Sequence, residues 1–157
     1  MHGSLLAIYI APNAKAQTIS LEHAELQVGQ GIVGDRYYQE NGTFSEILKG
    51  KADKEVTLIE SEQIDRFNTE NDFLFSYGYG DFRRNLVTQN VDLNALVGVH
   101  FKVGDTELKG IRLCEPCGHL AKILGPEVLL HMMHKAGLRA KVISGGVVSV
   151  GDVIEAV

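Results

Sequence analysis

The chain has 157 residues, enough for one domain that buries a substantial hydrophobic core. Its 45% hydrophobic and 22% charged residues are typical of a globular protein, and no apolar run approaches the roughly 20 residues of a membrane helix. The net charge of −5 argues against a protein that holds nucleic acid through its overall field. With two cysteines and no basic leader, we expect a cytoplasmic protein with free thiols.

Short alternating or β-branched runs separated by glycines predict a mainly β chain. In order they cover residues 5–10, 24–28, 55–60, 85–90, 100–113, 138–144 and 151–157. The pair Gly104-Asp105 favours a tight turn inside the fifth run, which makes it a hairpin. Many short strands and 17 glycines favour a β-barrel over a parallel α/β sheet.

A few short helices interrupt the strands. Over residues 60–71, Ile64 and Phe67 lie three apart on one face. Residues 125–137 begin with a proline in the first turn and end on a glycine, which predicts a second helix. With no repeat, low-complexity tract or linker, we expect a single domain over residues 1–157.

The segment RLCEPCGHL, residues 112–120, holds both cysteines, Cys114 and Cys117. With His131 and His134 it gives the spacing C-x₂-C-x₁₃-H-x₂-H, but zinc-binding histidine pairs are usually three to five residues apart. We therefore interpret the two histidines as partly exposed helix residues. A zinc deaminase is excluded, because Pro116-Cys117 is followed by Gly-His-Leu where that signature needs a further cysteine.

A thioredoxin-like pair would open a helix in a βαβ unit, whereas this segment lies in a β-rich pattern. The remaining possibility is a thiol between a strand and a short helix over residues 117–124, where a helix N-terminus favours the thiolate. Pro116 breaks the strand, so we expect Cys117 to face the predicted site and Cys114 to belong to the strand. The alternative, two packed structural cysteines, stays open.

Two other segments are suited to binding an anion. Residues 29–45 are rich in glycine and contain Arg36, and residues 81–87 contain Arg83, Arg84 and Asn85. For any one arginine, a surface ion pair is the simpler interpretation. Together with a poised thiol, they indicate a phosphorylated small molecule with a soft metal or sulfur centre.

Five blocks of the sequence resemble, in order, those of the MOSC domain family, named after the C-terminal domain of molybdenum cofactor sulfurase. They are GIVGDRYYQENGTFS, EVTLIESEQI, DFRRNLVTQNVDLNALVGVHFKVG, RLCEPCGHL and GLRAKVISGGVVSVGDVIEAV, within a core of about residues 25–156. The chain resembles the small, stand-alone bacterial type. The resemblance implies a MOSC-type β-barrel whose characteristic cysteine corresponds to Cys117.

Some members use this cysteine as the thiolate ligand of molybdenum in a molybdopterin-type cofactor, with arginines holding its phosphate, and reduce N-hydroxylated compounds. Others are proposed to carry sulfur as a cysteine persulfide. The expected catalytic residue, and molybdenum ligand if the metal is present, is Cys117; the expected cofactor-binding residues are Gly34, Asp35, Arg36, Arg83, Arg84, Asn85 and His119. Pyridoxal phosphate is associated only with a further domain of longer relatives.

The resemblance therefore implies either a molybdenum-cofactor-dependent reductase or a sulfur or cofactor carrier without turnover of its own. We expect a small-molecule substrate, a partner protein that donates electrons or sulfur, and neither nucleic acid nor membrane as a partner. A homodimer is compatible with an open-edged barrel. Cys114 is a packing residue, a resolving thiol or a guard against over-oxidation.

Overall fold

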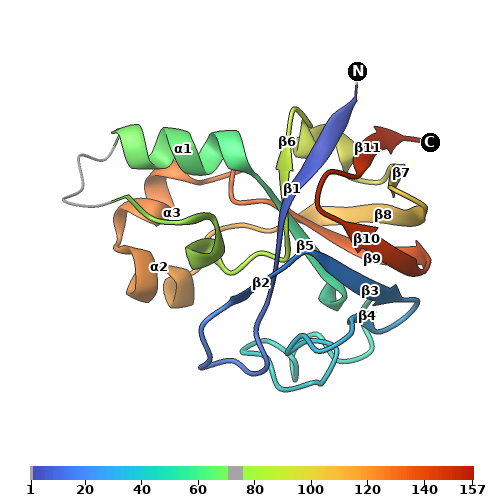
Figure 1. The fold of residues 1–157 in the computed structure, drawn as a ribbon. Helices are drawn as coiled ribbons and strands as arrows, with labels where there is room; N and C mark the ends of the chain where they lie inside the picture. The colour runs from blue at the N-terminus through green and yellow to red at the C-terminus, as the bar shows by residue number, and fades with distance from the viewer. Residues whose placement is uncertain (1, 71–75) are drawn as a thin grey trace.

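The computed structural model describes residues 2–70 and 76–157, so Asn71, the last residue of the helix predicted over 60–71, lies outside the described part. Within those ranges, seven strands close a barrel in the order β11-β7-β8-β9-β5-β6-β1, and β1 pairs in turn with β11 (Figure 1). Neighbouring strands pair antiparallel, whereas β5 and β6 run parallel. The predicted mainly β barrel with a few short helices is confirmed.

The barrel strands fall largely where the alternating runs predict them. They are β1 (Gly3–Ile10), β5 (Val56–Glu60), β6 (Leu86–Gln89), β7 (His100–Val103), β8 (Thr106–Leu113), β9 (Leu138–Ser144) and β11 (Val153–Ala156). The tight turn between β7 and β8 is confirmed. The sequence missed β2 (Ile19–Leu21), which extends the sheet beside β1, and β4 (Gly31–Ile32) and β10 (Gly146–Ser149), which flank β3 (His23–Gln27) in a small second sheet.

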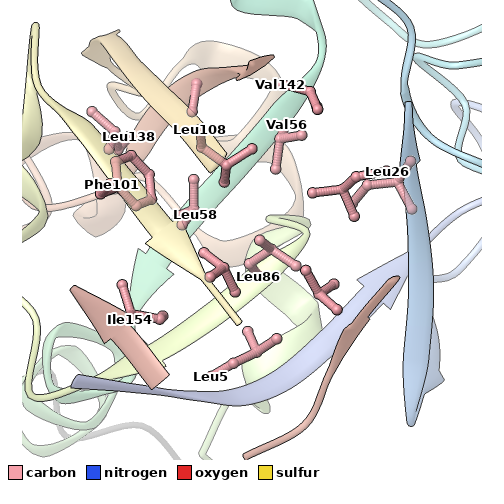
Figure 2. Packing of buried hydrophobic residues seen from close by; sticks show 14 of the residues in the cluster. Leu5, Leu26, Val56, Leu58, Leu86, Phe101, Leu108, Leu138, Val142 and Ile154 are labelled. Atoms are coloured by element: carbon pink, nitrogen blue, oxygen red, sulfur yellow. The ribbon is translucent and has the colours of Figure 1, made fainter. Parts of the chain in front are cut away.

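The barrel interior is the main hydrophobic core. Leucines, valines and isoleucines from the barrel strands converge there with Phe101, and Leu26 of β3 joins them from the small sheet (Figure 2). Successive strand residues point to opposite faces, so on β5 Leu58 enters this core and Ile59 points outward. Ile59 is nevertheless fully buried, because the helices cover the outside of the barrel at this point.

Three helices lie on one side of the barrel: α1 (Ser61–Glu70), α2 (Gly118–Leu124) and α3 (Glu127–His131) (Figure 1). Ile64 and Phe67 of α1 pack in a second core between the helices and the barrel, as their spacing predicts. Short 3-10 turns cover Ala52–Lys54, Tyr79–Phe82 and Leu93–Leu96. Among the described residues, no helix is long and apolar enough to cross a membrane.

The prediction of one helix over residues 125–137 is wrong in its extent. The α-helix ends at His131, and the chain then turns through His134, whose φ of 62° is left-handed. The N–H of His134 donates to the Glu115 carboxylate at 2.7 Å, an alternative to a helical hydrogen bond. Gly137 then passes close to β5, where an added Cβ would lie 2.1 Å from the Leu58 carbonyl oxygen. Only glycine permits this approach.

Candidate functional site

The two cysteines lie on the connection from β8 to α2. Cys114 directly follows β8, is 2% exposed, and donates its N–H to the Gly137 carbonyl at 2.8 Å. Cys117 is half-buried and is the N-cap residue of α2, with its carbonyl accepting the Ala121 N–H at 2.9 Å. The sequence therefore placed Cys117 correctly at the start of a helix. Both thiols are free.

Two hollows that share lining residues lie beside this segment. The narrow cleft, about 30 Å³, is lined mainly by Arg36, Tyr37, Thr43, Phe44, Thr57, Arg83, Arg84, Cys114, Cys117, His119, Leu120 and Arg139. The wide cavity, about 270 Å³, shares five of these residues, Phe44, Arg84, Cys114, Cys117 and Arg139. Cys117 lines both hollows, and so does Cys114, which we expected to belong to the strand. The strand ends at Leu113, so its alternation does not extend to Cys114.

Fixed positive charge is concentrated at these hollows. All the arginines of the chain except Arg66 line the cleft or the wide cavity, and among the described lysines none does so. Among the described residues that line the cleft, none is acidic. A chain with a net charge of −5 thus presents a local positive site, which attracts anions into a low-dielectric recess.

Arg36 is held in place by Asp35. The fully buried Asp35 carboxylate accepts the Ala11 N–H at 3.1 Å, the Tyr37 N–H at 3.2 Å and Arg36 Nη1 at 3.1 Å. Arg36 also donates to the Arg83 carbonyl at 3.0 Å. Asp35 therefore fixes the start of the segment that follows Gly34, whose φ is 89°. Gly34 and Asp35 were both predicted to bind the cofactor, but neither is among the residues that line the cleft or the wide cavity.

Arg83 and Arg84 bind backbone carbonyls. Arg83 donates to the carbonyls of Ala16 at 2.7 Å and Ala14 at 3.1 Å. Burial, followed by the neighbouring charge of Arg36, lowers the pKa of Arg83 from its usual value. Because carbonyls are neutral, these bonds orient the guanidinium groups without cancelling their charge.

Arg84 connects the cysteine segment to two other parts of the chain. It donates to the carbonyls of Ala136 at 2.9 Å, Cys114 at 3.2 Å and Phe82 at 3.3 Å. These bonds use three of its five donors, so two N–H groups are left for a ligand. The arginine fork that the sequence assigned to phosphate is therefore partly committed to the fold.

The predicted ligand Asn85 is directed into the protein. Its side-chain oxygen accepts the N–H and the hydroxyl of Thr57, each at 3.1 Å, and its amide donates to the Tyr9 carbonyl at 3.1 Å. It is 2% exposed and lies outside both linings. Its observed contacts join β1, β5 and the start of β6.

Two residues bring buried polar atoms to the cleft that have no partner within the described part of the chain. These atoms are His119 Nε2 and Arg139 Nε. The sequence singled out His119 but missed Arg139, which lies on β9 directly opposite Arg112 of β8. The alternation of LRAKVIS could have found it, because Leu138 and Ala140 point into the barrel and Arg139 must point outward.

The two downstream histidines contact acidic residues. His134 lies 2.6 Å from Glu115, and His131 lies 4.0 Å from Glu70. Among the described residues, no group of three or more His, Cys, Asp or Glu side chains is arranged to hold a metal ion. Any metal at Cys117 would need further ligands from a cofactor or solvent.

The sequence matches the model of the MOSC domain over residues 45–155. The chain belongs to the MOSC domain family. This match begins after most of the glycine-rich segment that we included in the resemblance. At family level, the MOSC domain is associated with binding of the molybdenum cofactor.

Solved structures agree with this fold. The chain is similar to the YuaD protein from Bacillus subtilis, with a TM-score of 0.82 and 16% identity over 99% of this chain and 96% of that one. It is also similar to YiiM from Geobacillus stearothermophilus, with a TM-score of 0.75 and 14% identity over 99% and 75% of the two chains. For YiiM from Escherichia coli the TM-score is 0.72, with 18% identity over 100% and 70%. No curated protein matches the sequence.

Proposed function

We propose that this MOSC-domain protein binds a molybdenum–pterin cofactor through the Cys117 thiolate and acts in the reduction of N-hydroxylated compounds. The observation that carries the proposal is a half-buried thiol within a cluster of fixed guanidinium charges, with no acid among the described residues that line the cleft. A thiolate is a soft ligand of the kind that molybdenum accepts. The arginines suit the phosphate and the other anionic groups of such a cofactor.

The residues present fit this group. His119 Nε2 and Arg139 Nε are buried polar atoms without a partner in the described chain, and such atoms are costly unless a ligand or water satisfies them. Cys117, His119 and Arg139 would hold the cofactor, and Arg84 has donors to spare. The wide cavity, rather than the cleft, has room for a molecule. When bound, the cofactor would supply redox chemistry beside the thiol, with electrons from a partner protein.

The test is metal analysis of the protein produced in a host that makes molybdopterin. We expect wild type to retain molybdenum and Cys117→Ser to lose it, because a hydroxyl is a harder and far weaker acid than a thiol. Cys114→Ala is the matched variant, since it removes the other thiol of the same segment. Far-ultraviolet circular dichroism would check that all three proteins are folded. Equal molybdenum in wild type and Cys117→Ser would contradict the thiolate role.

A second function, a sulfur carrier, is favoured by the size of the cleft. Its volume of about 30 Å³ holds roughly two water-sized groups, which is space for one added sulfur atom on Cys117. In this reaction the Cys117 thiolate attacks the outer sulfur of a donor protein's persulfide, that S–S bond breaks, and the donor leaves as a thiolate. Mass spectrometry after incubation with a persulfide donor should show one added sulfur on the Cys117 peptide. An unmodified peptide would contradict this function.

A further inference from the structure

A separate hollow of the protein, which we call the lysine pocket, is lined by Lys51, Lys54 and Lys141. Its volume is about 300 Å³, and none of its described lining residues also lines the cleft or the wide cavity. The lining holds one acidic residue, Glu55, and its other described residues are glycine, alanine or valine. The lysine pocket is therefore distinct from the arginine-rich site beside the thiols.

The carboxylates near the lysine pocket do not neutralise it. Glu55 is 5% exposed, and its carboxylate accepts the Val142 N–H at 2.9 Å. Burial raises the pKa of Glu55, although its backbone hydrogen bonds and the charges of Lys54 and Lys141 act in the opposite direction. Lys54 lies 4.0 Å from the exposed Glu40, which is the one ion pair that the three lysines form within the described chain. A surplus of positive charge remains when both carboxylates are counted.

The strand register adds a further unbalanced lysine beside the pocket. In one row across the sheet, Lys102 of β7 lies between Glu155 of β11 and Glu107 of β8, so the charges alternate. In the next row on the same face of β8, Lys109 lies directly opposite Lys141 of β9. Like charges at directly opposed positions repel each other. A bound anion would remove this repulsion.

The positions of the lysines favour an anion whose charge is spread over more than one group. Lys51 and Lys54 flank the 3-10 turn, whereas Lys141 belongs to β9, so the three ammonium groups come from two separate segments. A lysine binds phosphate as a point charge and needs no planar partner. Gly29 and Gly50 leave the rim open, because a Cβ added to either would meet no atom within 4 Å.

We propose that the lysine pocket binds a diphosphate group, either free or as part of a nucleoside diphosphate, with its oxygens on Lys51, Lys54 and Lys141. The volume of about 300 Å³ is at the lower end for small-molecule pockets and suits a compact ligand. Val28, which is 60% exposed, offers an apolar contact to the organic part of an esterified diphosphate. This site does not depend on the proposed function of the cysteine segment.

The test is calorimetric titration of the full chain, as purified, with pyrophosphate, ADP and orthophosphate in magnesium-free buffer of fixed ionic strength. We expect pyrophosphate or ADP to bind about tenfold or more tightly than orthophosphate, because the diphosphate reaches more than one lysine. Tighter binding of ADP identifies the esterified form, and equal or tighter binding of pyrophosphate identifies the free group. If neither binds more tightly than orthophosphate, the proposal is wrong.

Variants distinguish the lysine pocket from the arginine cluster, which also attracts anions. Lys141→Gln should weaken binding of the tighter diphosphate about threefold or more, and Lys51→Gln combined with it about tenfold or more. The matched control is Lys102→Gln, which removes the same charge from a lysine between two glutamates and should change the affinity less than about twofold. If Lys141→Gln does not fold, Lys51→Gln alone decides, because Lys51 is exposed.

Unchanged diphosphate affinity in the folded lysine variants would place the ligand elsewhere and overturn the proposal. Loss of binding in Arg139→Gln, with the lysine variants unaffected, would assign the diphosphate to the arginine cluster instead. Molybdenum retained by Lys141→Gln at the wild-type level would confirm that the two sites are separate.

Discussion

Replacing Asp35 by asparagine should destabilise the protein severely, because Asp35 is the buried counter-ion of a buried arginine. Asp35 is fully buried, Arg36 is 6% exposed, and Nη1 and Oδ1 lie 3.1 Å apart. The substitution keeps the volume but replaces the carboxylate by a neutral amide, so the buried charge of Arg36 is left with neutral partners, among them the Arg83 carbonyl and the Tyr37 ring. In either orientation of the asparagine amide, its NH₂ group would face a backbone N–H, of Ala11 or of Tyr37, that donates to the carboxylate in wild type.

Breaking a buried ion pair from one side costs about 3–5 kcal/mol. For a chain of this length, each kcal/mol corresponds to about 2–4 °C, so the melting temperature should fall by roughly 6–20 °C. Thermal unfolding followed by circular dichroism measures this, with the exposed hairpin-turn variant Asp105→Asn as a control that changes stability by less than about 0.5 kcal/mol. A loss below about 1 kcal/mol in Asp35→Asn would refute the structural role and favour direct ligand contact.

Other consequences of the structure can be measured separately. A limiting alkylating agent at mildly acidic pH should label half-buried Cys117 well before Cys114, which is 2% exposed, and preferential labelling of Cys114 would mean that the reactive sulfur is misassigned. Arg84→Lys should lower the affinity for a phosphorylated pterin by about tenfold to a hundredfold, because the bidentate fork is lost. It should also lower thermal stability, because lysine cannot span the three carbonyls that Arg84 binds. An unchanged affinity in the titration would mean that Arg84 has a structural role only. Although burial raises the pKa of Asp53, its hydrogen bond to Arg112 and the charges of Arg112 and Arg139 bring that pKa below its ordinary 3.8. The folded state thus holds this proton less tightly, so the stabilisation is fully present above pH 3.8 and is lost as the pH falls through the lower, folded value. The free energy of unfolding, measured with urea at a series of pH values, should show that loss in wild type and not in Asp53→Asn. If the free energies of the two proteins fall in parallel at acid pH, the assignment to Asp53 is wrong.

The barrel could be predicted from the sequence because its strands have local signals. Runs such as VTLIE and LRAKVIS alternate or are β-branched, and turn residues separate them. Two of the missed strands are too short for any period to appear, since β4 has two residues and β2 has three, whereas β10 has four. The overlong second helix has a different cause: beyond its end the His134 N–H donates to Glu115, which is 19 positions away and which helical periodicity cannot reveal.

The site was predictable only where a motif is local. The C-x-x-C segment identified Cys117 and the helix that it caps. Arg139 was missed although the alternation of LRAKVIS marks it as pointing outward, because its significance comes from pairing with Arg112 across two strands. Asn85 was predicted as a ligand because its amide can both donate and accept, but in the structure it accepts from Thr57, which lies 28 positions away on β5, and donates to Tyr9.

The arginines explain how an acidic chain can build a cationic site. Lysine could supply the charge, but its single ammonium on a flexible stem would not be fixed by several carbonyls at once. Arg84 is fixed by three carbonyls, from Phe82, Cys114 and Ala136, which lie far apart along the chain. The carbonyls cost the site no positive charge, because they are neutral. One of them belongs to Cys114, so the arginine that gives the cavity its charge also holds the segment that carries the thiol. Substitution of Arg84 should therefore change the position of the cysteine segment as well as the charge of the cavity, and a shift of that segment should in turn displace the Arg84 guanidinium.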